Sequence, residues 1–225
     1  MIAMLAPCSY ADQVCVVPNT PIPDNAPGGI TIPVMNDAGA SELIESIEVA
    51  LEITHPWVGD LVVTLTSPSG TSITLLDRPG IPSTGFPGPF GCGGRDLDAE
   101  FSDDASVFAE DVCSYSAMPV IAGPVIPVQS LSSFKGEPAL GEWVLHVSDH
   151  SAYDSGVVVQ VCLSTTTTIA CSPDLNGDGV LNFFDVSVFL NAFNTMNPVA
   201  DFTNDGEFNF FDVSSFLSAY NTGCP

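Results

Sequence analysis

Residues 171–225 carry an internal repeat that limits them to a paired arrangement. The segment DLNGDGVLNFFD, which begins at Asp174, recurs 27 residues later as DFTNDGEFNFFD, which begins at Asp201. After each copy, apolar residues follow at i, i+3, i+4 and i+7, the spacing of one helical face. They are Val186, Phe189, Leu190 and Phe193 in the first copy, and Val213, Phe216, Leu217 and Tyr220 in the second. One copy cannot bury its own stripe, so we expect two loop–helix units that pack against each other.

Each repeated loop has the side chains of a calcium site. Oxygen donors occupy loop positions one, three, five, nine and twelve, and a glycine (Gly179 or Gly206) occupies position six, where the chain turns sharply. With a carbonyl at position seven, each loop approaches the roughly 6–8 oxygen ligands that Ca²⁺ takes. The predicted ligands are Asp174, Asn176, Asp178, the Val180 carbonyl, Asn182 and Asp185, and then Asp201, Thr203, Asp205, the Glu207 carbonyl, Asn209 and Asp212.

Two further expectations concern these loops. Thr203 is a poorer oxygen donor than Asn176 at the same loop position, so we expect the first site to be the tighter. The alternative is that both segments are only turn-forming loops without an ion. Five donors at matching positions in two copies favour the calcium interpretation.

The repeat resembles the dockerin family over residues 173–222, including Asp at position twelve of each loop. Dockerins bind cohesin modules and attach enzymes to scaffolds, so the resemblance implies a docking role with Ca²⁺ as cofactor. The implied partner is a cohesin-like module or another surface scaffold. Positions ten and eleven carry small or hydroxylated residues in cellulosomal dockerins, whereas here they are Phe183-Phe184 and Phe210-Phe211.

Residues 15–164 show the pattern of an all-β domain, with short β-type runs separated by Pro, Gly, Asn and Asp clusters. Alternating apolar residues predict strands with one buried face. The predicted inward residues are Ile47, Val49, Leu51 and Ile53, then Trp143, Leu145 and Val147, and then Val157, Val159, Val161 and Leu163. The predicted fold class is therefore mainly β with a small α module, a β-sandwich followed by a paired loop–helix domain.

Composition sets the domain boundaries. A threonine run at 165–168 precedes a segment without Lys or Arg, so we predict a linker at 165–170 and a separate domain at 171–225. Residues 1–14 are assigned to a leader or a remnant of expression.

Between Ile47 and Leu163 the sequence resembles the P-domain (Homo B module) of proprotein convertases and of many bacterial subtilisin-like proteases. The matching residues are His55, Gly59-Asp60-Leu61, residues 67–71 (SPSGT), Leu75-Leu76, Phe134, Gly136-Glu137, residues 141–145 (GEWVL) and Gly156. The resemblance implies a jelly-roll β-sandwich that stabilises a neighbouring protease domain and influences its calcium and pH dependence. We expect a non-catalytic accessory protein associated with a subtilisin-like or other secreted protease. The alternative is a free-standing adhesion or matrix protein.

Charge and hydropathy exclude two classes of partner. Three Lys and Arg against 27 Asp and Glu give a formal net charge of -24, which repels nucleic acid. Because 45% of the residues are hydrophobic, this acidity does not indicate disorder and is explained better by cation binding. No apolar run reaches the roughly 20 residues of a transmembrane helix.

Seven cysteines occur without a C-x-x-C spacing, which favours disulfides in a secreted, extracellular or cell-surface protein. We expect Cys92 to pair with Cys113 and Cys15 with Cys162, which leaves Cys8 unpaired. We also expect Cys171 and Cys224 to clasp the two ends of the repeat domain.

Intrinsic catalysis is not expected. The only histidines are His55, His146 and His150, and no glycine-flanked serine motif of known hydrolases is present. The acidic stretch at 96–104 is interpreted as a solvated edge or, alternatively, as another structural calcium site.

Overall fold

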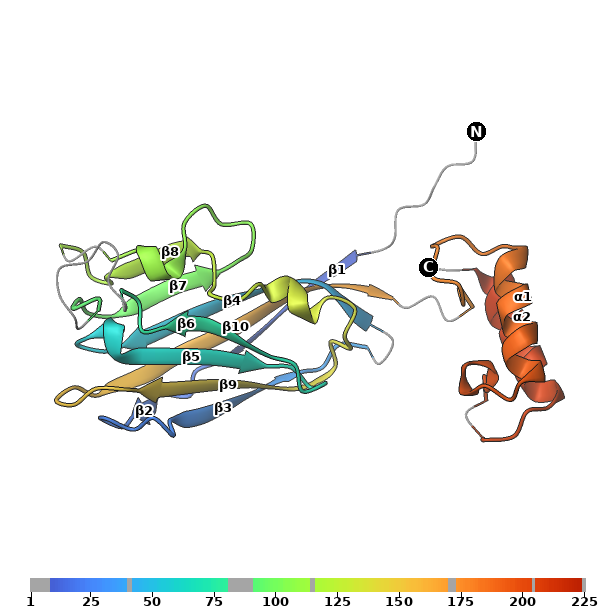
Figure 1. Cartoon of the computed structure of the whole chain (residues 1–225), viewed down its shortest axis with the longest axis horizontal. Coiled ribbons are helices and arrows are strands. Elements are labelled where there is room, and N and C mark those ends of the chain that lie inside the picture. Colours follow the sequence, from blue (N-terminus) through green and yellow to red (C-terminus); the bar gives the residue numbers. More distant parts are fainter. Residues whose placement is uncertain are drawn as a thin grey trace. The chain divides into compact units, whose positions relative to one another are not determined.

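A computed structural model of the chain describes residues 9–39, 42–80, 91–113, 116–169, 173–203 and 205–223. The chain divides into two compact units, one spanning Ser9–Thr168 and the other built from Ile169 onward. We call them the β unit and the helical unit (Figure 1). The protein is mainly β, with two sheets in the first unit and two α-helices in the second.

The β unit contains a six-stranded and a four-stranded sheet. The described pairings are antiparallel except for the parallel pair β7–β8. The larger sheet has the order β1 (Ser9–Val16), β10 (Gly156–Ile169), β4 (Glu42–Thr54), β7 (Leu97–Phe101) and β8 (Ile121–Val125), with β2 (Thr20–Ile22) also on β10. The smaller sheet has the order β3 (Ile30–Asn36), β9 (Gly141–Asp149), β5 (Leu61–Thr66) and β6 (Ser72–Asp77).

One apolar core lies between the two sheets. The predicted inward faces of β4 and β9 are confirmed, since their alternating residues from Ile47 to Ile53 and from Trp143 to Val147 are buried. In Figure 1, β5 and β9 overlap β4 and β10, and the buried residues of these strands belong to one hydrophobic cluster. Three short 3-10 helices join the strands: η1 (Val58–Asp60), η2 (Ala109–Asp111) and η3 (Leu131–Phe134).

The predicted inward face of β10 is correct for only part of the strand. Val161 and Leu163 are buried, but Val157 and Val159 are half-buried and Val158 is the buried residue. The alternation changes phase between two pairing regions of β10. Residues 156–158 of β10 pair with β2, and the residues from Val161 onward pair with β1. The two-residue alternation of apolar side chains in the sequence does not reveal where the buried face of a strand switches.

The predicted linker at 165–170 is wrong for most of its length. β10 continues to Ile169 and pairs with β1 from Val161 to Thr168. Thr165 and Thr167 are buried, and Thr167 Oγ1 donates a hydrogen bond to Glu42 at 2.6 Å. Threonine is β-branched and favours strands, so the run extends the sheet. Residues 9–14, predicted to be a leader or remnant, likewise form the edge strand β1.

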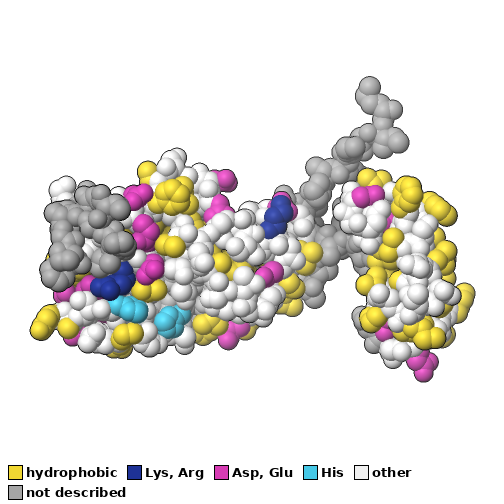
Figure 2. All heavy atoms as spheres, viewed as in Figure 1, with side chains coloured by type: hydrophobic (Ala, Val, Ile, Leu, Met, Phe, Trp, Pro, Cys, Tyr) yellow, Lys and Arg dark blue, Asp and Glu magenta, His cyan; other side chains and the backbone are white. Residues whose placement is uncertain are grey.

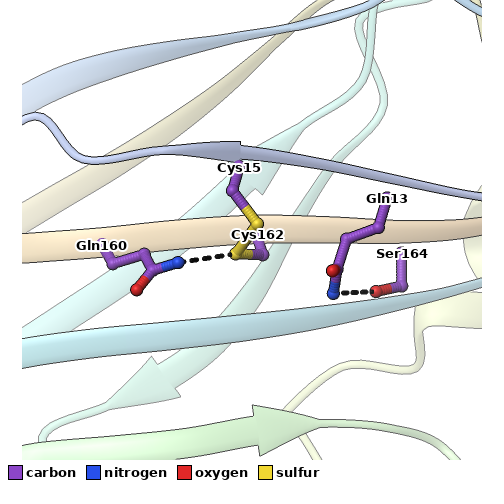
Figure 3. Close-up of a disulfide and its surroundings, with 5 residues drawn as sticks. All are labelled: Gln13, Cys15, Gln160, Cys162 and Ser164. Atoms are coloured by element: carbon purple, nitrogen blue, oxygen red, sulfur yellow. Dashed lines mark hydrogen bonds between the residues drawn. A yellow bond between two sulfur atoms is a disulfide. The ribbon is translucent and has the colours of Figure 1, made fainter.

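Two disulfides lock the β unit, and both are predicted pairings. Cys15 bonds to Cys162 and thereby joins β1 to β10, across a sequence separation of 147 (Figure 3). Gln160 Nε2 lies 3.2 Å from Cys162 Sγ on the same strand (Figure 3). Cys92 bonds to Cys113 across a separation of 21. Cys8, Cys171 and Cys224 lie outside the described residues.

The helical unit contains α1 (Phe183–Asn194), the 3-10 helix η4 (Pro198–Ala200) and α2 (Phe210–Thr222). Phe189 and Phe216, which occupy equivalent positions in the two repeats, stack with ring centroids 4.1 Å apart and planes 4° from parallel. The predicted stripes are otherwise incomplete, since Leu190 and Leu217 are exposed. Loop residues Leu175, Phe202 and Phe208 pack against the core together with Val186, Phe193, Val213 and Tyr220.

Candidate metal centre

Each helix begins immediately after its loop because the ninth loop residue caps it. Asn182 Oδ1 accepts a hydrogen bond from the Phe184 amide, and Asn209 Oδ1 accepts one from the Phe211 amide, each at 2.8 Å. Asp185 and Asp212, at the third helical position, accept bonds from the backbone amides of the same two asparagines. These reciprocal bonds form a capping box, which ties loop position twelve to position nine.

The first loop turns its carboxylates toward its own backbone. Asp174 accepts hydrogen bonds from the amides of Gly177 and Gly179 at 2.9 and 2.8 Å. Asp185 accepts the Asn182 amide at 2.8 Å and the Asn176 amide at 3.3 Å. Positions one and twelve of the loop are thus both folded back over its centre.

The second loop brings three carboxylates together. Asp201, Asp205 and Asp212 each offer one oxygen, and these oxygens lie within 4.8 Å of one another. Thr203 Oγ1 donates to Asp212 Oδ1 at 2.8 Å, so the hydroxyl at position three lies beside this group. Clustered carboxylates repel one another unless a cation lies among them, and hard oxygen donors suit Ca²⁺. The residues present therefore fit a calcium ion.

The two buried carboxylates of the loops are held in their ionised form. Burial opposes ionisation of Asp185, but the hydrogen bonds from the Asn182 and Asn176 amides outweigh it and hold its pKa below the ordinary value. The Asn209 amide acts first on Asp212, with further hydrogen bonds from Thr203, and lowers its pKa against the effect of burial. A metal ion would meet deprotonated ligands.

Other predicted ligands serve the loop fold in this structure. Asp178 Oδ1 accepts the Val180 amide, and Asp205 Oδ1 accepts the Glu207 amide. The Val180 carbonyl accepts a hydrogen bond from the Asn182 side chain at 2.9 Å. Among the described residues, the carboxylates that come within 4.8 Å of one another as a group of three are those of the second loop.

The aromatic pairs beside the loops are displayed to solvent in both repeats. Phe183 and Phe184 are 74% and 67% exposed, and Phe210 and Phe211 are 75% and 67% exposed. Figure 2 shows hydrophobic side chains on the surface of the helical unit. Four exposed phenylalanines in about 55 residues form an unusual surface for a soluble protein.

In the β unit, residues that carry the P-domain resemblance contact one another across the fold. Ser67 and Thr71, in the turn between β5 and β6, both donate hydrogen bonds to the Glu137 carboxylate. Phe134 and Trp143 pack edge to face with centroids 5.0 Å apart. These roles are structural, because they hold a turn and the core.

His55 is also structural. Its side chain and that of Asp149 are both completely buried, with Nε2 3.2 Å from Asp149 Oδ2 and Nδ1 2.8 Å from the Trp57 carbonyl. A Cβ on Gly156 would lie 2.4 Å from the Thr54 carbonyl and 2.6 Å from the His55 ring, so only glycine fits there. In the described part of the chain, no serine hydroxyl bonds to His55.

The acidic stretch at 96–104 has separate roles for its members. Asp98 and Glu100 point outward from β7 and are exposed. Asp103 accepts the Leu131 and Ser132 amides at the start of η3, and Asp96 accepts the His55 amide. Asp98 and Glu100 thus lie on a solvated edge, whereas Asp96 and Asp103 fix neighbouring backbone amides.

Comparison with known proteins bears on the β unit. Residues 44–87 match the family model of the proprotein convertase P-domain. The match covers β4 to β6 and supports the P-domain part of the predicted resemblance. No curated protein matches the chain significantly.

Two similar solved structures contain a serine protease of Aeromonas sobria. In complex with the chaperone ORF2, it has 16% identity, a TM-score of 0.47 and coverage of 73% of this chain and 28% of that chain. The protease alone has 16% identity, a TM-score of 0.43 and coverage of 72% and 27%. The chain thus spans less than a third of the length of these structures.

Proposed function

We propose that this protein is a secreted, calcium-dependent accessory protein. Its β unit is the P-domain-like part and associates with a protease domain. Its helical unit binds two Ca²⁺ ions and docks onto a protein partner. P-domains are non-catalytic accessory domains of proteases, so the chain assists proteolysis and does not itself cleave.

The observation that carries the calcium proposal is the convergence of Asp201, Asp205 and Asp212 within 4.8 Å. The first loop has acidic residues at the same three positions, which supports a second ion. When bound, Ca²⁺ would join the ends of each loop and supply the positive charge that the segment lacks. The ligand residues of each loop would thereby hold the start of the following helix.

The docking proposal rests on the exposed phenylalanine pairs. Each pair begins a helix directly after a loop, so an ion in the loop would fix the position of the pair. The proposed partner presents an apolar surface and is a cohesin-like module or another surface scaffold. Aromatic residues of this kind are enriched at protein interfaces.

Secretion is supported by the two disulfides, which persist in oxidising compartments. Within the described ranges, no helix is long and apolar enough to cross a membrane.

Isothermal titration with CaCl₂ tests the metal proposal. We expect two sites in the full chain, with the tighter one lost in Asp174→Ala/Asp185→Ala and the weaker one lost in Asp201→Ala/Asp212→Ala. Asp98→Ala, an exposed carboxylate outside the loops, is the matched control and should leave both sites intact. Unchanged calcium binding in the two loop variants would overturn the proposal.

Association with a protease is tested by the coding sequence upstream of this segment and by co-purification. A subtilisin-like or metalloprotease domain that precedes the β unit and binds it supports the proposal. A matrix or adhesion protein without an enzyme partner is the alternative outcome.

A further inference from the structure

A cavity of about 310 Å³ opens beside η1 in the β unit, away from the calcium loops. Its volume lies at the lower end of the roughly 300–1,000 Å³ of small-ligand sites. Two segments far apart in the sequence form its walls. The lining residues are Trp57 and Asp60 from the first segment, and Ser151, Ala152, Tyr153 and Asp154 from the second.

Asp60 is the buried acidic wall of this cavity. The residue is only 4% exposed. Among the hydrogen bonds and ion pairs of the described residues, none involves its carboxylate, although its backbone bonds to Trp57 and His150. A carboxylate on a largely buried residue that lines a cavity is positioned to receive a cation there.

The charged groups around Asp60 include both acidic and basic side chains. Burial, followed by repulsion from Asp149 and Asp154, raises its pKa to about 6, although His55 and Arg78 act in the opposite direction. The ion pair of His55 is directed to Asp149. The groups around Asp60 therefore leave excess negative charge at the cavity.

Two aromatic residues, Trp57 and Tyr153, line the cavity together with Asp60 and Asp154. Trp57 is half-buried, and its ring packs so close to Gly93 that a Cβ there would lie 2.7 Å from it. Tyr153 is 96% exposed and has a φ of 93°, a strained value for a residue with a side chain. The Asp24 carboxylate accepts the amides of Tyr153 and Asp154 at 2.9 and 3.3 Å and so holds this conformation.

We propose that this cavity binds an arginine side chain of a polypeptide partner. A guanidinium group stacks on aromatic faces and donates hydrogen bonds to carboxylates, which is what Trp57, Tyr153, Asp60 and Asp154 offer together. Ca²⁺ would instead need about six oxygen ligands, and indole and phenol faces supply none of these.

None of the chain's basic side chains, Arg78, Arg95 and Lys135, lines the cavity, although Arg78 acts on Asp60 from outside it. Lys135 pairs with Glu45 at 2.6 Å. Figure 2 shows that basic side chains are sparse on the drawn face, while acidic ones occur across it. A basic segment of a partner would be attracted to such a surface.

Nuclear magnetic resonance titration of the ¹⁵N-labelled full chain tests this proposal. The chain has two tryptophans, and Trp143 is fully buried, so the indole signal of Trp57 reports on the cavity. The probe is N-acetyl-arginine amide at about pH 7.5, above the pKa of Asp60. The control is N-acetyl-citrulline amide, which has a similar shape without the charge. Trp57→Phe assigns the indole signal.

We expect the arginine probe to shift the Trp57 signal with a dissociation constant on the order of millimolar. The citrulline probe should bind at least about tenfold more weakly. Asp154→Asn and Tyr153→Ala, both at accessible positions, should each weaken binding severalfold, and Asp60→Asn should abolish it if the variant remains folded. Asp98→Asn should have no effect.

Three results would overturn the proposal. Equal shifts with both probes would show that charge is not recognised. Full binding by the Asp154→Asn and Tyr153→Ala variants would remove these residues from the site. A shift of the Trp57 signal by CaCl₂ alone, with none by arginine, would identify a metal site instead. Because the reporter lies in the β unit, none of these results depends on calcium binding by the repeated loops.

Discussion

The two units hold their buried carboxylates in opposite ways. In the β unit, burial raises the pKa of Asp60 to about 6 and that of Glu110 to about 7. In the helical unit, backbone amides overcome burial and keep the pKa values of Asp185 and Asp212 below the ordinary range. Ionisation of Asp60 and Glu110 therefore opposes folding of the first unit, whereas ionisation of Asp185 and Asp212 favours folding of the second. Carboxyl groups have opposite effects in the two units because more hydrogen-bond donors reach Asp185 and Asp212 than reach Asp60 and Glu110.

The two units also differ in the size of their apolar cores. The β unit has a large apolar core and two disulfides, whereas the apolar core of the described part of the helical unit is a small cluster around four buried residues, Phe189, Ala192, Ala200 and Phe216. Apolar burial and covalent links therefore stabilise the β unit. The helical unit depends more on its loops, and the predictions below test that contrast.

The largest effect is expected from removal of calcium. A chelator should abolish the thermal transition of the helical unit and leave that of the β unit in place, because an ion contributes its binding free energy to a small domain. Scanning calorimetry with and without EDTA measures both transitions. If both transitions keep their midpoints in EDTA, the units do not differ in calcium dependence.

The next effect concerns the stacked ring pair at the centre of the helical unit. Phe189→Ala should destabilise that unit by about 3–5 kcal/mol, because the ring is almost fully buried against Phe216. Phe184→Ala, at an exposed position in the same helix, should change stability by less than about 0.5 kcal/mol. Circular dichroism melts in saturating calcium compare the two. A similar loss in both variants would contradict the assigned core.

A smaller loss is expected when the disulfide between β1 and β10 is removed. Cys15→Ala/Cys162→Ala should destabilise the β unit by about 2–4 kcal/mol and leave the helical transition unchanged. The Cys92–Cys113 disulfide closes a shorter loop, so Cys92→Ala/Cys113→Ala should lower the free energy of unfolding by less in the simple chain-entropy account. The reverse order in denaturant titrations would show that native contacts, and not loop length, decide the contribution.

The smallest effect is a difference in pH dependence. The folded pKa of Glu110 is raised to about 7, so its contribution to stability is fully present below the unfolded value of 4.5 and is lost as pH rises through 7. Glu110→Gln should therefore stabilise the β unit by about 1–2 kcal/mol at pH 8 and hardly at pH 4.5. Glutamine retains the oxygen that accepts the Asp77 amide at 2.8 Å.

Denaturant titrations of Glu110→Gln and of the parent protein at several pH values measure this difference in stability. The stability of the helical unit should depend on pH in the opposite way. The contribution of Asp185 and Asp212 is present above the unfolded pKa of 3.8 and is lost as pH falls through their lowered pKa values. A constant difference between Glu110→Gln and the parent protein at every pH would contradict the burial of a titrating carboxyl group.

The parts of the molecule that were predictable from sequence are those set by local spacing. Period-two alternation identified the buried faces of β4 and β9, and the repeat placed all proposed ligands of each ion in one segment of twelve residues. The helical spacing alone does not predict which apolar residues of the repeat fill the core. Leu190 and Leu217 have the correct helical spacing but are exposed, while Phe202 and Phe208 from the loops contact the core.

Long-range pairing explains the remaining differences. The threonine run resembles a linker in composition, but β1 and Glu42 provide partners that make it a strand. The change of phase within β10 depends on which strand lies beside it. The cavity at Asp60 combines residues 57–60 with residues 151–154, and no local motif relates these segments.

The Cys15–Cys162 bond has a mechanical consequence. If the helical unit anchors the protein, tension enters the β unit at the end of β10, next to the Ser9–Thr168 pair. The bonds that join this end of β10 to β1 and to β4, including the Thr167–Glu42 hydrogen bond, would then break one after another from that end. The opening would stop at Cys162, because the disulfide is a covalent barrier. Residues 163–169 would act as an extensible tether, and the rest of the β unit would remain folded under load.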